Sequence, residues 1–111
     1  MKTFQPSEED FGKTVIELAQ LYDWLVSHFR PGRTLQGWRT AIQGDKGFPD
    51  LVLVRSPRVI FAELKSERGR LTPEGKAWKE LLEQCPGVEY YLWRPEDWEE
   101  IELVLRKGDK K

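Results

Sequence analysis

The sequence GFPDLVLV, residues 47–54, is followed after a short gap by RVIFAELK, residues 58–65. Both segments are runs of aliphatic and β-branched residues of strand length, and Pro57 in the gap is typical of a turn. We therefore predict a β-hairpin. Asp50 begins the first strand and Glu63 lies near the end of the second, so antiparallel pairing brings the two acids to one edge of the sheet.

Lys65 is expected at the same edge. Side chains alternate between the faces of a strand, so Glu63 and Lys65 project from one face. Two converging carboxylates repel unless a positive charge lies between them, and Mg²⁺ or Mn²⁺, which prefer oxygen ligands, would supply it. The lysine would orient the attacking water and offset charge on a phosphate. We predict Asp50, Glu63 and Lys65 as catalytic residues; the alternative is a surface ion pair on an ordinary hairpin.

The strings GFPD, residues 47–50, and ELKSERGRL, residues 63–71, resemble the signature of the VRR-NUC family of the PD-(D/E)XK nuclease superfamily, particularly its small stand-alone phage proteins. The likeness extends from about Ser7 to Trp98. It implies one domain over residues 1–111, with a restriction-endonuclease-like core at about 7–106. It also implies a metal-dependent DNA endonuclease that hydrolyses phosphodiester bonds, with branched, junction or flap DNA as its substrate class.

Further metal ligands are expected around the two acids. Members of the superfamily commonly draw a glutamate from the first helix, and a helical wheel selects Glu8, about 60° from the centre of the apolar face, with Glu9 in reserve. Glu8 supporting the helix dipole is an equally good explanation. The backbone carbonyl of Leu64 is a further expected ligand. His28, the single histidine, is assigned no catalytic role, and a phosphate contact is the minor alternative for it.

The start of the second expected helix departs from the family pattern. Relatives usually carry a glutamine where this chain has Gly75. The substrate or water contact of that glutamine is therefore in doubt, with Glu74 or Lys76 as substitutes. This departure keeps a second hypothesis open, a nucleic-acid-binding module with a degenerate nuclease site. A third is an interaction domain that binds a partner through its acidic C-terminal helix.

The net charge of −1 conceals a segregation along the chain. Residues 1–29 hold two basic and five acidic side chains, residues 30–79 hold eleven and five, and residues 80–111 hold five and nine. The cationic central segment contains the hairpin, as expected for a protein that binds an anionic polymer, although a chance asymmetry is the alternative. We expect phosphate contacts from Arg33, Arg39, Lys46, Arg68, Arg70 and Lys76.

The remaining pattern predicts an α/β fold in the order αβββαβα, a mixed sheet flanked by helices. Strands on either side of the second helix should pair in parallel because a helical crossover joins them. The expected elements are a helix over residues 7–29, a first strand over 34–42 broken at Gly37, the hairpin, a helix from the Thr72 N-cap to Pro86, a strand over 88–93 and a helix over 95–106.

The composition favours a single globular domain, since the 111 residues are 39% apolar and 33% charged. No apolar run approaches a membrane span and the N-terminus is no secretory signal, so we expect a cytoplasmic protein, in the host cytoplasm if phage-encoded, with no membrane partner. The lone cysteine, Cys85, is expected to be a small buried hydrophobe. DNA is the expected partner and no organic cofactor is expected. A homodimer is also expected, because so short a chain offers little surface for gripping a duplex.

Overall fold

The computed structural model describes residues 7–29, 32–34, 37–39 and 43–108, and for Glu8 and the two short segments it describes the backbone alone. The elements are α1 (Glu8–Leu21), β1 (Leu25–His28), β2 (Gly32–Thr34), β3 (Gly37–Arg39), β4 (Leu51–Arg55), β5 (Arg58–Leu64), α2 (Pro73–Glu83), β6 (Glu89–Trp93), the 3-10 helix η1 (Pro95–Asp97) and α3 (Trp98–Arg106).

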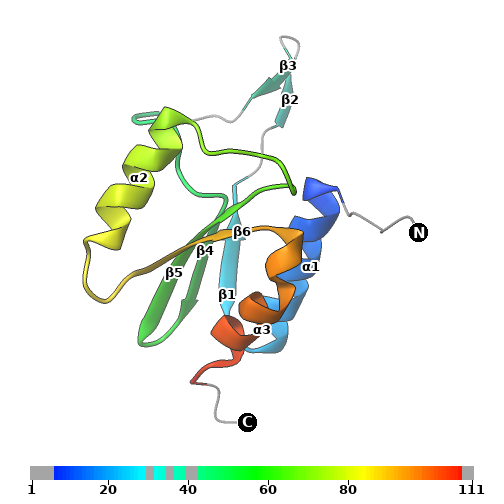
Figure 1. Ribbon diagram of the computed structural model, residues 1–111, viewed down its shortest axis with the longest axis vertical. Helices are drawn as coiled ribbons and strands as arrows, with labels where there is room; N and C mark the ends of the chain where they lie inside the picture. The colour runs from blue at the N-terminus through cyan, green and yellow to red at the C-terminus, as the bar shows by residue number, and fades with distance from the viewer. Residues whose placement is uncertain (1–6, 30–31, 35–36, 40–42, 109–111) are drawn as a thin grey trace.

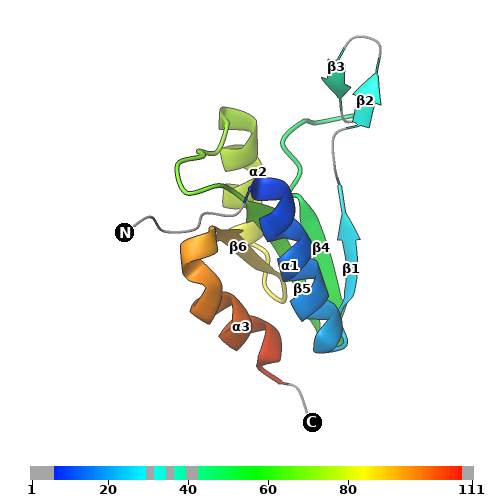
Figure 2. The same cartoon turned by 90° about the vertical axis from the view of Figure 1, so that its right-hand side faces the viewer.

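A four-stranded mixed sheet in the order β1-β4-β5-β6 forms the centre of the fold. The predicted hairpin is confirmed as β4 and β5, which pair antiparallel with Leu51 opposite Ala62. The predicted parallel pairing across the helical crossover is also confirmed, because β5 and β6 run parallel. Helices α1 and α3 lie together against the sheet, and α2 lies apart from them, beyond β5 and β6 (Figures 1 and 2).

The core lies between one face of this sheet and the helices α1 and α3. Alternate side chains of β4 and β5 are fully buried there, and helical positions four residues apart meet them. Burial of each large aliphatic side chain stabilises the fold by about 1.5–3 kcal/mol. The cluster comprises Phe11, Val15, Ala19, Trp24, Leu51, Leu53, Ile60, Ala62, Leu64, Trp93, Ile101 and Leu105. The same alternation turns Phe61 and Glu63 to the other face of the sheet.

The prediction of one helix over residues 7–29 is wrong beyond Leu21, where α1 ends. Asp23 adopts a left-handed conformation with φ 69°, which aspartate tolerates better than most residues. The chain then turns back along the sheet as β1, whose Val26 lies opposite Leu53 of β4. The apolar spacing of residues 25–28 suits either a helix or a strand. As a strand, this segment forms hydrogen bonds with the backbone groups along the edge of β4, which would stay unpaired if the helix continued.

The predicted first strand over residues 34–42 is wrong in its place, because its described residues do not join the central sheet. Its described residues are Thr34, which ends β2, and residues 37–39, which form β3, and these two strands pair so that Arg33 lies opposite Trp38 in a separate two-stranded sheet. Figure 1 shows this small sheet standing apart from the central one. Residues 35–36 and 40–42 lie outside the described part of the chain. The strand that pairs with β4 on the side away from β5 is β1.

The second predicted helix is confirmed as α2. Thr72 is its N-cap, accepting a 3.0 Å hydrogen bond from the Gly75 amide, and Pro73 occupies the first turn. The prediction that Cys85 is buried is wrong, because Cys85 follows the end of α2 and is exposed. No helix in the described ranges is both long and apolar enough to cross a membrane.

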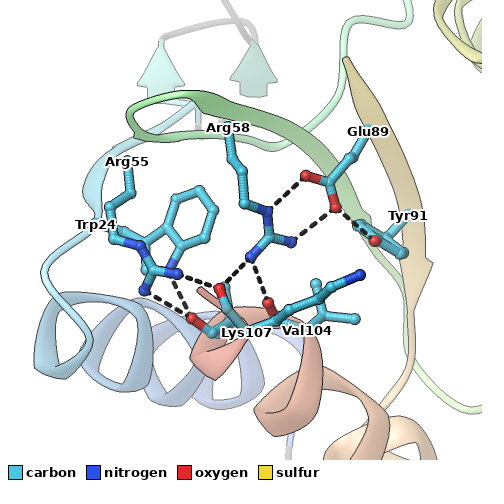
Figure 3. A network of polar contacts seen from close by, with 8 residues as sticks. Trp24, Arg55, Arg58, Glu89, Tyr91, Val104 and Lys107 are labelled. Atoms are coloured by element: carbon cyan, nitrogen blue, oxygen red, sulfur yellow. Dashed lines mark hydrogen bonds and ion pairs between the residues drawn. The ribbon is translucent and has the colours of Figure 1, made fainter. Parts of the chain in front are cut away.

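Arg55 and Arg58, next to the turn between β4 and β5, form hydrogen bonds that connect the C-terminal end of α3 to the sheet (Figure 3). Both guanidinium groups lie over the Trp24 ring, Arg55 at 4.6 Å and Arg58 at 5.0 Å from its centroid. Arg55 donates to the carbonyl groups of Leu105 and Lys107. Carbonyl groups at a helix end lack intrahelical partners, so these cations act as its cap.

Arg58 completes this network. It forms a two-point ion pair with Glu89, at 2.8 and 2.7 Å, and donates to the carbonyl oxygens of Val104 and Lys107 (Figure 3). The pairing with Glu89 raises the pKa of Arg58 and lowers that of Glu89. Two of the eleven basic residues of the central segment are therefore engaged at the far end of the hairpin from Asp50, so the segregation of charge in the sequence overstates the cationic surface around the acids.

Candidate functional site

The two predicted acids meet where β4 begins and β5 ends. Asp50 directly precedes Leu51, whose partner is Ala62, so the next position on β5 across from Asp50 is Glu63. The Leu64 amide donates a 2.8 Å hydrogen bond to Oδ2 of Asp50, which draws this carboxylate toward the end of β5. The structure therefore brings Asp50, Glu63 and the backbone of Leu64 together.

Lys65 joins the acids at this edge. Its Nζ lies 3.2 Å from Oε2 of Glu63, and the two side chains are only 20% and 12% exposed. The Lys65 amide donates a 3.0 Å hydrogen bond to the carbonyl of Trp93, which keeps the chain extended beyond β5. Extended backbone places the lysine two positions from Glu63 on the same face, as predicted.

Burial and mutual repulsion make the two carboxyl groups hard to ionise together. Burial is the largest cause that raises the pKa of Glu63 to about 7, and the charge of Asp50 adds to it, while Lys65 opposes both. Burial also raises the pKa of Asp50, against the Leu64 amide and the charges of Lys65 and His28. A pair of carboxylates with these properties would be stabilised by a cation bound between them.

His28 lies near this edge, on the face of the sheet that carries Leu51 and Leu64. It ends β1 opposite Leu51, and its charge acts on the carboxylate of Asp50. A β-carbon placed on Gly12 of α1 would lie 3.5 Å from Cε1 of His28 and 3.2 Å from Cδ1 of Leu64, so α1 crosses the sheet close to this edge. The sequence signal for this position of His28 is the strand pattern of residues 25–28, which the apolar spacing of a continued helix also fits.

Among the described residues, no group of three histidine, cysteine, aspartate or glutamate side chains is close enough to hold a metal ion. Glu8 is the first residue of α1, but its side chain lies outside the described part of the chain, so its role as a ligand stays a prediction. Glu9, the reserve candidate, is exposed. Asp50 and Glu63 are thus the two carboxylates that the structure brings together.

The predicted phosphate contacts fall into two sets. Lys46, Arg68, Arg70 and Lys76 are exposed, as phosphate-binding residues must be. Arg33 and Arg39 belong to β2 and β3, and their side chains lie outside the described part of the chain.

The loop that carries Arg68 and Arg70 is held in shape by Arg94, which the sequence analysis did not single out. Nη1 of Arg94 donates hydrogen bonds of 2.8 and 2.6 Å to the carbonyl oxygens of Ser66 and Gly69. The loop follows Lys65 directly, so Arg94 positions these exposed cations relative to the acidic site.

An aromatic cluster fixes the segment that leads into Asp50. The ring of Phe48 meets Phe29, Phe61 and Trp78 edge to face, with centroids 5.3, 5.9 and 5.0 Å apart. Such contacts are each worth about 0.5–1.5 kcal/mol beyond the area they bury. Because Phe48 precedes Asp50 by two residues and Phe61 precedes Glu63 by two, this cluster sets the approach of the two strand ends.

Gly47 allows the same segment to touch the start of α2. Its φ of 93° is unfavourable for residues with a side chain, and a β-carbon there would lie 2.6 Å from the carbonyl carbon of Glu74 and 2.8 Å from the Gly75 nitrogen. Gly75 is itself buried, and a β-carbon on it would lie 3.1 Å from Cδ2 of Leu71. The glycine that replaces the expected glutamine is therefore part of a close backbone contact.

No family model matches the chain, and no curated protein or solved structure matches it either.

Proposed function

We propose that this protein is a metal-dependent DNA endonuclease that hydrolyses phosphodiester bonds. The observation that carries the proposal is the meeting of the Asp50 and Glu63 carboxylates with the Lys65 ammonium group at one edge of the sheet. Its fold is proposed to be the restriction-endonuclease-like core of the VRR-NUC family, on the resemblance of residues 47–50 and 63–71.

The donor set at this edge fits Mg²⁺ or Mn²⁺. Both carboxylates offer oxygen atoms, which these ions prefer. Burial and then repulsion from Asp50 raise the pKa of Glu63 to about 7, and a bound divalent cation would favour the ionised form against both effects. Asp50 and Glu63 would hold the ion, with Glu8 and the Leu64 carbonyl as further proposed ligands. When bound, the ion would polarise the phosphate and lower the pKa of water.

The chain's own residues have distinct tasks in this proposal. Lys65 orients the attacking water and stabilises negative charge that develops on the phosphate, since its ammonium group is held beside Glu63. The exposed cations of the Arg94-held loop, Arg68 and Arg70, contact the DNA backbone together with Lys46 and Lys76. A two-fold dimer would present two such sites to one DNA molecule, and branched, junction or flap DNA is the proposed substrate class.

A nucleic-acid-binding module without cleavage is the second candidate function. It is favoured by Gly75, which stands where the resembling family usually has a glutamine and which lies buried against Leu71. DNA binding without metal-dependent cleavage would support this alternative.

Incubation with supercoiled plasmid tests the proposal. Nicking is expected with Mg²⁺ or Mn²⁺ and should be abolished by a chelator, by Asp50→Asn and by Glu63→Gln. Glu99→Gln, which changes an exposed acid on α3, serves as the control and should cleave normally. A panel of branched and linear oligonucleotides then defines the substrate. Undiminished cleavage by either folded site variant would overturn the assignment of the site.

A further inference from the structure

An open groove of about 280 Å³ lies between one face of α2 and residues 45–46. It is lined by Asp45, Lys46, Glu74, Ala77, Trp78 and Leu81. Its walls are mostly apolar, and Leu81 is 64% exposed there. The volume is close to the lower limit of about 300 Å³ for small-molecule sites. The groove therefore suits one planar ring system.

Trp78 forms a rigid wall of this groove. Its indole Nε1 donates a 2.8 Å hydrogen bond to the carbonyl of Lys46, and its ring meets Phe48 edge to face at 5.0 Å. Both contacts fix the plane of the ring before any ligand arrives, which lowers the entropic cost of binding. Indole rings are effective stacking partners for the faces of nucleic-acid bases.

The charged groups around the groove determine which ring would fit. Asp45 and Glu74 line the groove and are exposed, and carboxylates accept hydrogen bonds from amino groups and repel phosphate. Lys46 also lines the groove and is exposed, and its positive charge would attract a phosphate that flanks the ring. This combination complements a nucleobase with an exocyclic amino group, and it disfavours a phosphate inside the groove.

We propose that this groove binds an unpaired nucleobase bearing an exocyclic amino group, in a single-stranded part of the DNA. This inference deepens the proposed function, because it assigns to the substrate an unpaired base beside the cleavage site. The groove and the acids are connected directly, since residues 45–50 run from Asp45 and Lys46 past Phe48 to Asp50. A base in the groove would thus be held by the segment that positions Asp50.

The test follows the indole signal of Trp78 by NMR during titration with single-stranded homo-oligomers in metal-free buffer, where no cleavage occurs. The Trp78 signal is identified by its loss in Trp78→Phe. Octamers of deoxycytidine should shift this signal. Octamers of thymidine, whose base has a similar shape but no amino group, should bind about tenfold more weakly.

Variants of the groove wall supply the second measurement. Ala77→Met fills the groove and Leu81→Ser removes an apolar wall, and both sites are exposed on α2, so the fold should tolerate them. Each should weaken binding of the deoxycytidine octamer roughly tenfold, the order expected for the loss of one base–aromatic contact. Leu103→Ser, at a 57% exposed leucine of α3, is the matched control and should bind like the parent.

Each outcome separates this inference from the proposed function. An unmoved Trp78 signal, or equal affinity for the two octamers, would overturn the groove assignment whether or not the parent nicks plasmid. A shifted Trp78 signal with weakened groove variants would support the assignment even if the parent failed to cleave DNA, in which case only the endonuclease proposal would fall.

Discussion

Nζ of Lys65 lies 3.2 Å from Oε2 of Glu63, and the residue between them, Leu64, is buried on the opposite face of the sheet. A lysine–glutamate ion pair that is exposed to solvent contributes little to the free energy of unfolding, about 0–1 kcal/mol. The Lys65–Glu63 pair is largely shielded from solvent and adjoins a second carboxylate, Asp50. The charges of these three groups therefore have a larger effect on the stability of the protein and on its dependence on pH.

The stability of the metal-free protein should fall as the pH rises from about 4.5 to about 7. The pKa of Glu63 is raised from 4.5 to about 7, so the folded protein binds this proton more tightly than the unfolded chain does. The resulting stabilisation is fully present below the lower value and is lost as the pH passes the upper one. Glu63→Gln should therefore be more stable than the parent at pH 8, by about 3 kcal/mol.

Urea denaturation in chelator at several pH values measures this effect. Asp50 and His28 are present in both proteins, so the difference between the two curves reports the ionisation of Glu63 together with its coupling to Asp50. Parallel curves over pH 4.5–8 would show that Glu63 titrates normally in the folded protein.

Gly47→Ala should destabilise the protein by about 3 kcal/mol, through a strained φ and a collision with the backbone of Glu74. Gly44→Ala is the matched control. Gly44 also has a positive φ, 109°, but no atom lies within 4 Å of a β-carbon there, so the cost should be about 1 kcal/mol. Thermal or urea unfolding compares the two variants, and equal losses would mean that the contact with α2 is unimportant.

Arg58→Met should also destabilise the fold, by about 3 kcal/mol, because it removes the two-point ion pair with Glu89 and the hydrogen bonds to the carbonyl oxygens of Val104 and Lys107. Arg106→Met is the control, since Arg106 makes only an exposed 3.5 Å ion pair with Glu102. Urea denaturation should separate the two variants clearly. A small loss for Arg58 would show that α3 is held mainly by its apolar face.

DNA affinity should depend on the exposed loop cations and not on the arginines at the far end of the hairpin. Each neutralised phosphate contact contributes about 0.9 to the slope of log affinity against log salt concentration. Arg68→Gln and Arg70→Gln should each reduce the slope by about that amount. Lys79→Gln, which removes a lysine already paired with Glu83 on α2, should leave it unchanged. Fluorescence anisotropy with a labelled oligonucleotide gives these slopes, and a flat response to salt in the parent would argue against DNA as the ligand.

The sequence predicted the parts of the fold that depend on local signals. Alternating apolar residues around a turn predicted β4 and β5, and the Thr72 cap with Pro73 predicted the start of α2. The predicted first helix is too long because residues 25–28 fit both the periodicity of a helix and that of a strand. Only the open hydrogen-bonding edge of β4, a long-range feature, decides between them.

The geometry of the site could be predicted because the short separation of Glu63 and Lys65 and the hairpin register fix which side chains meet. His28 and Arg94 could not be predicted in the same way. Each lies near the site through long-range pairing, His28 through β1 and Arg94 through carbonyl groups of the loop after Lys65. Contacts between residues so far apart in the chain produce no pattern of spacing in the sequence from which they could be predicted.

Lys65→Ala separates catalysis from the binding of metal. If Lys65 orients the attacking water and stabilises transition-state charge, its removal should slow the chemical step by roughly 10²-fold while Asp50 and Glu63 still bind Mg²⁺. DNA affinity should change little, because the lysine is 20% exposed and already paired with Glu63. Single-turnover cleavage at saturating enzyme and metal measures the chemical step alone.

Lys79→Ala provides the matched comparison, since Lys79 also pairs with a glutamate, at 3.0 Å from Glu83, but on the surface of α2. That variant should cleave at the parent rate. If Lys65 served only to neutralise the two acids in the absence of metal, Lys65→Ala would be less stable without Mg²⁺ but fully active once Mg²⁺ is saturating. A rate within about threefold of the parent, a difference of about 0.7 kcal/mol in the barrier, would therefore remove Lys65 from the proposed mechanism and leave it a role in folding alone.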